Sequence, residues 1–573
     1  MLDAKAESAL LSALGPHLED FVAALFGIEA DVRALEAQHH ELAPLFAVKR
    51  LFVQRRAMNR FNASEALTFD GAALQRELQV TLGEALTELA FANAVTRWQQ
   101  DEAAYATELD TAARYAAWAV HTPAGRAATK GGVLFRAPRK LDVMRLVPIE
   151  YAERHGVAAI KLAGDNVRWR EGFALTDPGT NLAGGLAEAH YCIWCHEQSK
   201  DSCAHGLMEK KPATGVPLAD SFKKSAFGVA LAGCPLEQKI SEFHKLRAEG
   251  WPIAALAMIC VDNPLVAATG HRICNDCMKS CIFQKQDPVD IPQSETRVLK
   301  DVLALPWGFE IYSLLTRWNP LHLRRPVPLP GTGKHVLVVG MGPAGFTLAH
   351  HLLNDGHTVV GIDGLKIEPL EPALSGITIA GERVPFLPIR DTAGLSEPLD
   401  ERVMAGFGGV AEYGITVRWD KNFLKIVRLL LERRARFALY GGVRFGGTLD
   451  DAGAFALGFD HIALATGAGK PTVLDLPNGL ANGVRTASDF LMALQLTGAA
   501  KRGSLANMQV RLPVIVVGGG LTAIDTATEA LAYYPVQVEK FLDRHKTLVA
   551  ERGNVAVEAA WTSTERVLSL IHI

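Results

Sequence analysis

The sequence predicts a mainly α-helical first half followed by a second half of α/β domains. Residues 1–120 are rich in Ala, Leu and Glu, and their apolar residues recur at spacings of three and four, as in amphipathic helices. Residues 335–363 and 513–530 each combine a short apolar strand, a glycine-rich turn and a helical apolar pattern. This order is typical of domains built on a parallel sheet. A chain of 573 residues is long enough for about three or four domains.

Composition restricts the classes of function. Hydrophobic residues make up 49% of the chain and charged residues 21%, and the net charge is −3, which is ordinary for a globular protein. No basic run indicates binding to nucleic acid. No apolar segment approaches the roughly 18 residues of a membrane span, and residues 1–15 lack the basic start and apolar core of a signal peptide. We therefore expect a cytoplasmic protein.

The first region, residues 1–150, carries no recognisable chemistry. Its spacing pattern is that of a helical bundle or a docking surface, and the sequence assigns it no role. After His121 the chain becomes richer in glycine and proline, which indicates a connector that runs to about Gly185.

The cysteines indicate metal or redox chemistry within residues 151–325. All eight lie between Cys192 and Cys281, and the rest of the chain contains none. Groups of thiolates with a Cys-Pro pair, here at Cys234, suit iron–sulfur clusters, and we expect two [4Fe–4S] clusters in a helical domain. Zinc is the alternative, because paired cysteines also build tetrahedral zinc sites. Three histidines could complete such a site: His196, His205 and His271.

The stretch from His335 to Asp363 is the most specific motif in the chain. Val336–Val339 indicate a buried strand, and a second strand ends on Asp363. Glycines in the turn between them permit a sharp bend, a close approach to a pyrophosphate and close packing of helix on strand. The helix N-terminus attracts phosphate, and an acid at the second strand can accept ribose hydroxyls. The expected cofactor-binding residues are Gly340, Gly342, Pro343, Ala344, Gly345 and Asp363.

Two further turns support a single dinucleotide-binding domain over residues 326–485. Gly408 and Gly409 follow a long irregular segment, and Thr466 and Gly467 form a tight turn after an apolar strand. Turns of this kind allow backbone to lie close to a cofactor.

A second glycine-rich motif starts at Pro513. We expect a strand over Val514–Val517, followed by a turn with small residues at its three defining positions. These positions are Gly518, Gly520 and Ala523. Two such units imply two dinucleotides, most simply FAD and NAD or NADP exchanging a hydride. We therefore expect residues 486–567 to begin an NAD(P)H-binding domain.

Several short motifs occur together in one order. The α/β part contains VVGMGPAG, GGVAEYGI, ALATGA and VVGGGLTAID, and the cysteine-rich part contains Cys234-Pro235, DNPL from Asp262 and the cysteines up to Cys281. Together they resemble the glutamate synthase small-subunit family of flavin and iron–sulfur reductases, which includes the N-terminal half of dihydropyrimidine dehydrogenase. The resemblance covers about Cys192 to Glu529. It implies a helical domain with two [4Fe–4S] clusters, followed by Rossmann-like domains for FAD and NAD(P)H.

The resemblance also sorts the cysteines into two ligand sets. One [4Fe–4S] cluster would be held by Cys192, Cys195, Cys203 and the distant Cys281. The other would be held by Cys234, Cys274, Cys277 and, where the family has Gln or Glu, Glu295. Cys260 falls at a position that is usually apolar, so we expect a buried side chain without a ligand role.

In this family, electrons would pass between NAD(P)H, FAD and the two clusters to a partner protein or a second active site. The sequence names no acid or base for such a reaction. Two alternatives stay open: a zinc-stabilised, nucleotide-binding scaffold without turnover, and a true glutamate synthase subunit.

The chain also departs from the family pattern. About 30 residues separate Cys203 from Cys234, some 40 extra residues precede Gly408, and Thr416 and Leu521 replace the usual Pro and Asn. YYPVQVEKFLDRH lacks the pattern of a further strand, so the NAD(P)H-binding domain is expected to be truncated at its C-terminal side. The last six residues, 568–573, are expected to be a non-native tail.

Overall fold

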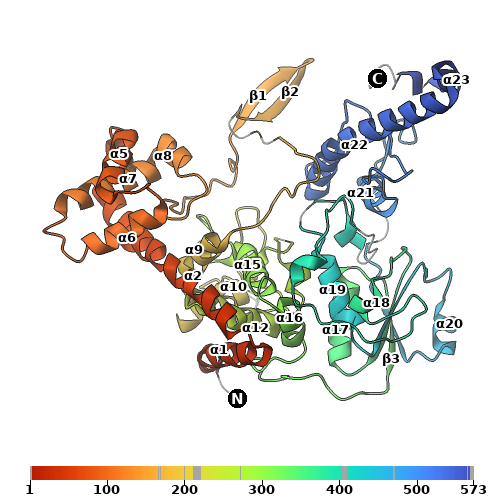
Figure 1. Cartoon of the computed structure of the whole chain (residues 1–573), viewed down its shortest axis with the longest axis horizontal. Coiled ribbons are helices and arrows are strands. Elements are labelled where there is room, and N and C mark those ends of the chain that lie inside the picture. Colours follow the sequence, from red (N-terminus) through yellow and green to blue (C-terminus); the bar gives the residue numbers. More distant parts are fainter. Residues whose placement is uncertain are drawn as a thin grey trace. The chain divides into compact units, whose positions relative to one another are not determined.

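The computed structural model describes residues 3–567, apart from 165, 166, 168, 199, 211–220, 272, 403–408, 418, 469, 470 and 564. Gly408 and the expected tail at 568–573 therefore lie outside the described residues. The chain forms two compact units, each assembled from three separate segments (Figure 1). Unit 1 comprises Met1–Val147, Gly179–Val266 and Cys274–Pro326, and unit 2 comprises Pro148–Pro178, Ala267–Ile273 and Val327–Ile573.

The N-terminal part of unit 1 is helical, as the apolar spacing predicts. Asp3 caps the first helix by accepting a hydrogen bond from the backbone N–H of Ala6 (2.8 Å), and Gly27 ends it in the left-handed conformation. A π-helical stretch, Lys49–Ala57, continues the second helix. The helices are α1 (Ala4–Phe26), α2 (Glu29–Val48), α3 (Met58–Arg60), α4 (Ala63–Ala66), α5 (Gly71–Leu82), α6 (Glu88–Trp98), α7 (Ala106–His121) and α8 (Pro123–Ala128).

The cysteine-bearing part of unit 1 packs around one helix, α12 (Pro252–Asp262), which is apolar up to its last residue. Its residues from Ile253 to Cys260 are all buried, and it packs against α1, α11 and α15. The helices in this part are α9 (Leu182–Tyr191), α10 (Ser202–His205), α11 (Ile240–Ala248), α12 (Pro252–Asp262), α14 (Asp276–Ser280), α15 (Ile291–Leu303) and α16 (Gly308–Leu315). The short helix α13 (Val266–Thr269) begins at the last residue of the middle segment of unit 1 and otherwise belongs to unit 2.

Helix α1 corrects the expectation that no apolar segment is long enough to cross a membrane. Among the described residues it is the one helix whose length, 23 residues, and apolar composition meet that requirement. In this structure it packs inside unit 1: Ser8 donates to the carboxylate of Glu242 (2.6 Å), and the N–H of Ala254 donates to Glu19 (3.0 Å). Length and composition alone do not distinguish a membrane span from a buried core helix.

Unit 2 contains a four-stranded parallel sheet, as the glycine-rich motif predicts. The strand order is β5-β4-β3-β6, so β3 has a neighbour on both sides. Ala454 of α20 packs with Leu337, Val339 and Ile362 on one face, and α17 and α19 lie on the other (Figure 1). The elements are β3 (His335–Val339), α17 (Pro343–Asn354), β4 (Thr358–Asp363), α18 (Pro372–Ser375), α19 (Phe423–Glu432), β5 (Phe437–Gly441), α20 (Asp451–Ala456) and β6 (His461–Leu464).

The remaining elements of unit 2 lie outside the sheet. An antiparallel hairpin pairs β1 (Ile149–Arg154) with β2 (Val157–Leu162), within the predicted connector. The C-terminal helices are α21 (Ala487–Leu496), α22 (Leu521–Arg552) and α23 (Asn554–Ala559).

The strand expected at Val514–Val517 does not form, and this prediction was wrong. Residues 513–517 pair with no other strand in the described part of the chain, and Ile515 is 85% exposed. A parallel strand exists only through hydrogen bonds to a neighbour, so the apolar run by itself is insufficient.

Candidate functional site

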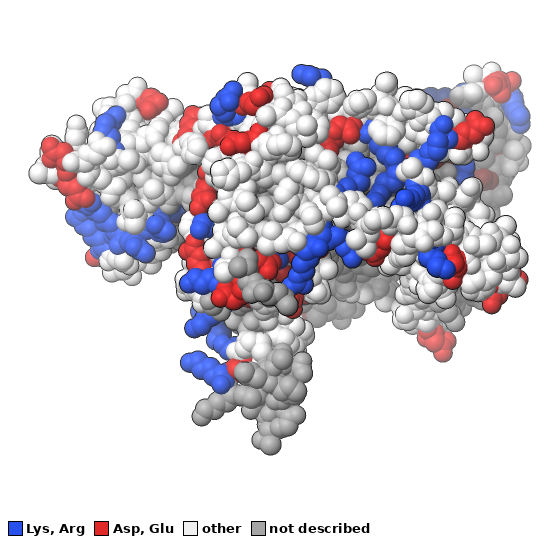
Figure 2. Space-filling model, turned by 90° about the horizontal axis from the view of Figure 1, so that it is seen from below, with Lys and Arg blue, Asp and Glu red and all other residues white. Residues whose placement is uncertain are grey.

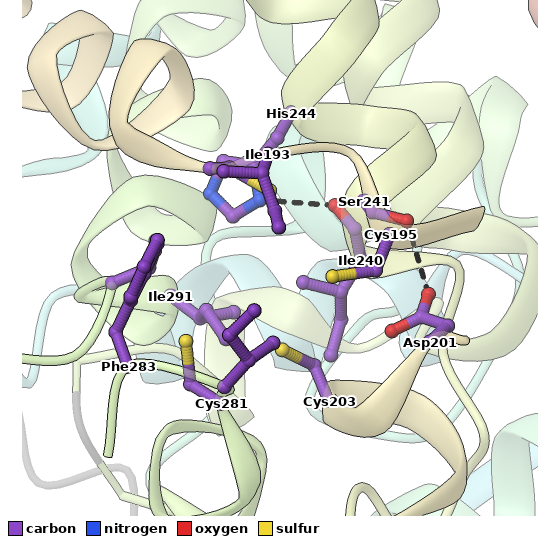
Figure 3. Close-up of a pocket in the computed structure, with 13 residues that line it drawn as sticks. Ile193, Cys195, Asp201, Cys203, Ile240, Ser241, His244, Cys281, Phe283 and Ile291 are labelled. Atoms are coloured by element: carbon purple, nitrogen blue, oxygen red, sulfur yellow. Dashed lines mark hydrogen bonds between the residues drawn. The ribbon is translucent and has the colours of Figure 1, made fainter. Parts of the chain in front are cut away.

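Four cysteines from separate segments line one cavity in unit 1. They are Cys192, Cys195, Cys203 and Cys281, the first ligand set expected from the sequence. Figure 3 shows the sulfur atoms of Cys195, Cys203 and Cys281 turned toward the same space. The wall between them is largely apolar and includes Ile193, Ile240, Val289 and Ile291. The cavity therefore presents soft sulfur ligands in surroundings with little water.

Local structure fixes each of these cysteines. Cys192 caps the C-terminus of α9 through a hydrogen bond from its N–H to the carbonyl of Glu188 (3.0 Å), and Cys281 caps α14 in the same way. Cys195 begins a 3₁₀ turn, and Cys203 lies in α10, whose N-terminus Asp201 caps. Cys281 thus comes from the third segment of unit 1, Cys274–Pro326, whereas the other three cysteines of the cavity come from the second segment, Gly179–Val266.

Burial controls the protonation of these thiols. It raises the pKa of Cys192, and it raises that of Cys195 to about 11. A hydrogen bond from the Cys203 thiol lowers the pKa of Cys281 to about 7. Cysteine binds metal as the thiolate, so a group held by all four sulfurs would have to displace their protons.

The cavity also holds a buried polar atom without a partner. Nδ1 of His244 donates to the carbonyl of Ile240 (3.0 Å), so Nε2 of the neutral ring is an acceptor. That Nε2 is buried and makes no hydrogen bond within the described part of the chain, and His244 lines the cavity. Unpaired buried polar atoms are unfavourable. A further group in the cavity therefore fits both the sulfur donors and this orphaned nitrogen.

The members of the second expected ligand set interact electrostatically. Burial raises the pKa of Cys234 and of Cys277, and the nearby Glu295 and Cys274 raise both further. Burial raises the pKa of Glu295 itself to about 7, and Gln238 donates a hydrogen bond to its carboxylate (2.7 Å). These three cysteines and one carboxylate therefore lie within electrostatic reach of one another.

Cys260 lies apart from both sets. It is buried in α12, and burial alone raises its pKa, without a contribution from any charged neighbour. This buried, uncharged environment agrees with the expectation that Cys260 acts as a small apolar side chain.

The side chains as they stand do not form a closed metal site. In the part of the chain that the structure describes, no three His, Cys, Asp or Glu side chains are close enough to hold one metal ion, so their spacing does not distinguish zinc from a cluster. The histidines considered for zinc have other contacts: His196 with Ser241 (2.7 Å), His205 with Glu237 (3.7 Å) and His271 with Phe423 (4.6 Å).

The first glycine-rich turn in unit 2 admits no side chain at two positions. Gly340 has a φ of +92°, and a Cβ there would lie 2.5 Å from the carbonyl oxygen of Ala465. A Cβ on Gly345 would lie 1.8 Å from the carbonyl oxygen of Gly340. Gly342 forms the N-cap of α17, and Pro343 and Ala344 open its first turn. The helix N-terminus is thus left open for a ligand, as a phosphate-binding turn requires.

The other expected cofactor residues of unit 2 lie at the carboxyl edge of the sheet or beside it. Asp363 accepts hydrogen bonds from the N–H groups of Met341 (2.9 Å) and Leu365 (2.9 Å), so its carboxylate lies directly at the glycine-rich turn. Thr466 and Gly467 follow β6 beside Gly340, and the turn that begins at Gly409 packs against α17. Gly408 lies outside the described residues.

The second glycine-rich turn is built differently. Gly520 forms the N-cap of α22 and Ala523 lies in its first turn, as expected. A Cβ on Gly520 would meet nothing within 4 Å, and one on Gly518 only the Cβ of Ala523 at 3.5 Å. Without the strand, this turn lacks the close backbone packing of the first.

Sequence reasoning missed two residues that support these sites: Gln238, which donates to Glu295, and His244, which lines the first cavity. It also missed the buried carboxylate of Glu529, which accepts from Ile415 N–H (2.9 Å) and Thr416 Oγ1 (2.6 Å). Gln238 follows Cys234 by four residues, which is a usable signal. Nothing in the helical pattern around Glu529 distinguishes it from an exposed acid.

The chain matches two family models. Residues 334–562 match the pyridine nucleotide-disulphide oxidoreductases, and residues 1–27 match the RP005 N-terminal alpha-helical domain.

Three relatives are similar over longer stretches. RP006, an uncharacterized protein of Rickettsia prowazekii, is 51% identical over 51% of this chain and 40% of its own length. RP005 of the same organism is 30% identical over 42% of this chain and 81% of its own length. The glutamate synthase [NADPH] small chain of Bacillus subtilis is 26% identical over 59% of this chain and 57% of its own length. The chain thus spans about half the length of RP006 and of the Bacillus protein.

Proposed function

Because this chain belongs to the glutamate synthase small-subunit-like family of oxidoreductases, we propose that it transfers electrons between NAD(P)H, FAD and two [4Fe–4S] clusters in the cytoplasm. The electrons would continue to, or arrive from, a partner protein or a second active site. The observation that carries the proposal is the cavity surrounded by Cys192, Cys195, Cys203 and Cys281, since these residues are separated by up to about 90 positions in the sequence.

Unit 2 would hold the FAD. The N–H groups at the start of α17 would bind the pyrophosphate beside Gly340 and Gly342, and Asp363 would exchange its backbone hydrogen bonds for the ribose hydroxyls. Thr466 and Gly467 would border the same site from β6. Gly518, Gly520 and Ala523 remain our candidates for the NAD(P)H pyrophosphate.

Unit 1 would hold the clusters. The first would be bound by the four cysteines of the cavity, with Ile240 and Ile291 excluding water. The second would be bound by Cys234, Cys274, Cys277 and Glu295, with Gln238 orienting the carboxylate. Bound flavin supplies an exchange between hydride and single-electron chemistry, and bound clusters supply single-electron transfer.

Metal and flavin analysis of the full chain tests this proposal. Anaerobically purified protein should contain about eight iron and eight sulfide ions per chain, the content of two [4Fe–4S] clusters, together with FAD. The variant Cys281→Ser should lose about half of the iron, because it removes one ligand of one cluster. Cys260→Ala is the matched control and should retain all of it, since Cys260 lies apart from both ligand sets.

Other results would overturn parts of the proposal. Stoichiometric zinc with no sulfide would support the scaffold alternative instead. Loss of iron from Cys260→Ala together with full retention in Cys281→Ser would show that the ligand sets are wrongly assigned.

A further inference from the structure

Unit 1 contains a second pocket that neither the cysteines nor the glycine-rich turns explain. Its volume is about 500 Å³, and it is formed by the end of α8, the stretch from Thr129 to Leu146, and Asp287. Figure 2 shows one face of the molecule, on which Lys and Arg side chains gather at several places. The pocket is lined by six basic residues: Arg126, Lys130, Arg136, Arg139, Lys140 and Arg145.

These cations outnumber the acids around them. None of the six makes an ion pair with a carboxylate in the described part of the chain, although Glu188 lies close enough to Arg136 to interact with it electrostatically. The two acids in the lining are engaged by backbone: Asp287 accepts from the N–H of Arg139 (3.2 Å), and Asp142 from that of Met144 (3.0 Å). Arg126 and Arg139 lie close enough to repel each other. The pocket therefore carries a concentrated positive field.

The framework of the pocket is fixed before any ligand binds. Arg126 donates to the carbonyl of His121 (2.7 Å) at the C-terminus of α7. The carboxylate of Glu88 accepts from the N–H groups of Val133 (2.8 Å) and Leu134 (3.1 Å), which anchors the loop after α8 to α6. Preformed sites avoid the free-energy cost of ordering loops on binding.

The lining also has an apolar component. Phe135, Leu141 and Leu146 contribute to it, and Leu146 is 64% exposed. A pocket of this volume is in the range of small-molecule sites, and a few convergent polar groups on an apolar wall are typical of them. Guanidinium forks match the oxygen atoms of phosphate better than a point charge does.

We propose that this pocket binds a small organic molecule carrying two or more phosphates, of the nucleoside di- or triphosphate class. Its phosphates contact the exposed cations Arg139, Lys140 and Arg145, and its organic part lies against Leu141 and Leu146. The inference is independent of the proposed electron transfer, because it uses none of the residues of the cysteine and glycine sites.

Calorimetric titration of the full chain with ATP tests the proposal, with inorganic pyrophosphate as competitor. Arg139→Glu combined with Lys140→Glu should weaken ATP binding at least tenfold, and higher salt should weaken binding to the parent. The matched control is Lys223→Glu combined with Lys224→Glu, which makes the same charge change on exposed residues of unit 1 outside the pocket. It should bind ATP as the parent does, and pyrophosphate should displace ATP from both.

Several outcomes would overturn the proposal. ATP that binds equally to the Arg139→Glu, Lys140→Glu variant occupies another site, such as a glycine-rich turn. If the parent protein does not bind ATP at millimolar concentration, the pocket does not recognise phosphates. The same follows if pyrophosphate does not compete with ATP. If an acidic protein binds the parent but not this variant while ATP binds neither, the pocket is a protein-docking surface instead.

Discussion

The two glycine-rich motifs of unit 2 share a sequence pattern but have different structures. In the first, β3 pairs with β4 and β6, and Val338 is fully buried. In the second, the corresponding segment, residues 513–517, pairs with no strand among the described residues. Its helix α22 nevertheless forms, and Tyr533 and Glu529 are fully buried in its contacts.

The difference separates local from non-local determinants of structure. A helix makes its hydrogen bonds within itself, so the motif's helical half forms wherever its apolar face finds a partner. A parallel strand makes all of its hydrogen bonds to segments distant in sequence. A match to the motif therefore predicts the helix more securely than the strand or the cofactor site.

The largest difference is expected in amide hydrogen exchange. The amides of Val336–Val339 should exchange at least about a thousandfold more slowly than those of Val514–Val517, since only the former lie inside a paired sheet. Exchange followed by mass spectrometry of peptides covering both segments measures this. Comparable protection in the two peptides would mean that the second strand does form in solution.

The next largest difference is expected in the free energy of unfolding when the third small residue of each motif is substituted. Gly345→Ala should destabilise unit 2 by about 3 kcal/mol or more, because the new Cβ would lie 1.8 Å from the rigid backbone oxygen of Gly340. Ala523→Gly, at the matching position of the second motif, should cost only about 1 kcal/mol as a helix-interior glycine. Urea unfolding followed by circular dichroism measures both. Equal effects would contradict the closer packing of the first turn.

Substituting the first glycine of each motif by alanine should give a smaller difference in stability between the two motifs. Gly340→Ala should cost roughly 2–4 kcal/mol, because strain at a φ of +92° adds to a clash with Ala465. Gly518→Ala should cost about 1–2 kcal/mol, since its φ of +130° is strained but its nearest contact is at 3.5 Å. A larger loss for Gly518→Ala in the same urea experiment would reverse this ranking.

The smallest effect is expected at Gly520. Gly520→Ala should lower the free energy of unfolding by only about 0.5–1 kcal/mol, because alanine is a poorer N-cap residue than glycine, while the negative φ and the open space around the position add no strain. A measured loss above 2 kcal/mol would indicate packing around this turn that the structure lacks.

The sequence predicted local features well. The helices of residues 1–120, the sheet strands β3 and β4, and the positions of Gly340 and Gly345 follow from periodicity and from turn geometry. The grouping of Cys281 with Cys192 was expected only from the family resemblance, because spacing carries no information on contacts across about 90 residues.

Other features had no readable signal in the sequence. The basic pocket depends on Asp287 meeting the stretch after α8, which is a tertiary contact. The failure of the strand at Val514–Val517 depends on which segments lie beside it, because the apolar runs of the two motifs, VLVV and VIVV, differ in one residue only.

The separation of the cavity cysteines along the chain sets an order of events during synthesis. Cys281 leaves the ribosome about 80 residues after Cys203, a delay of roughly 4–16 s at 5–20 residues per second. Until Cys281 is synthesised, the cavity has only three of its four thiols. Part of the chain between Cys203 and Cys281, residues Ala267–Ile273, belongs to unit 2. Any group that needs all four sulfurs can be inserted only after this segment has folded back, so maturation of the site follows translation of at least the first half of the chain.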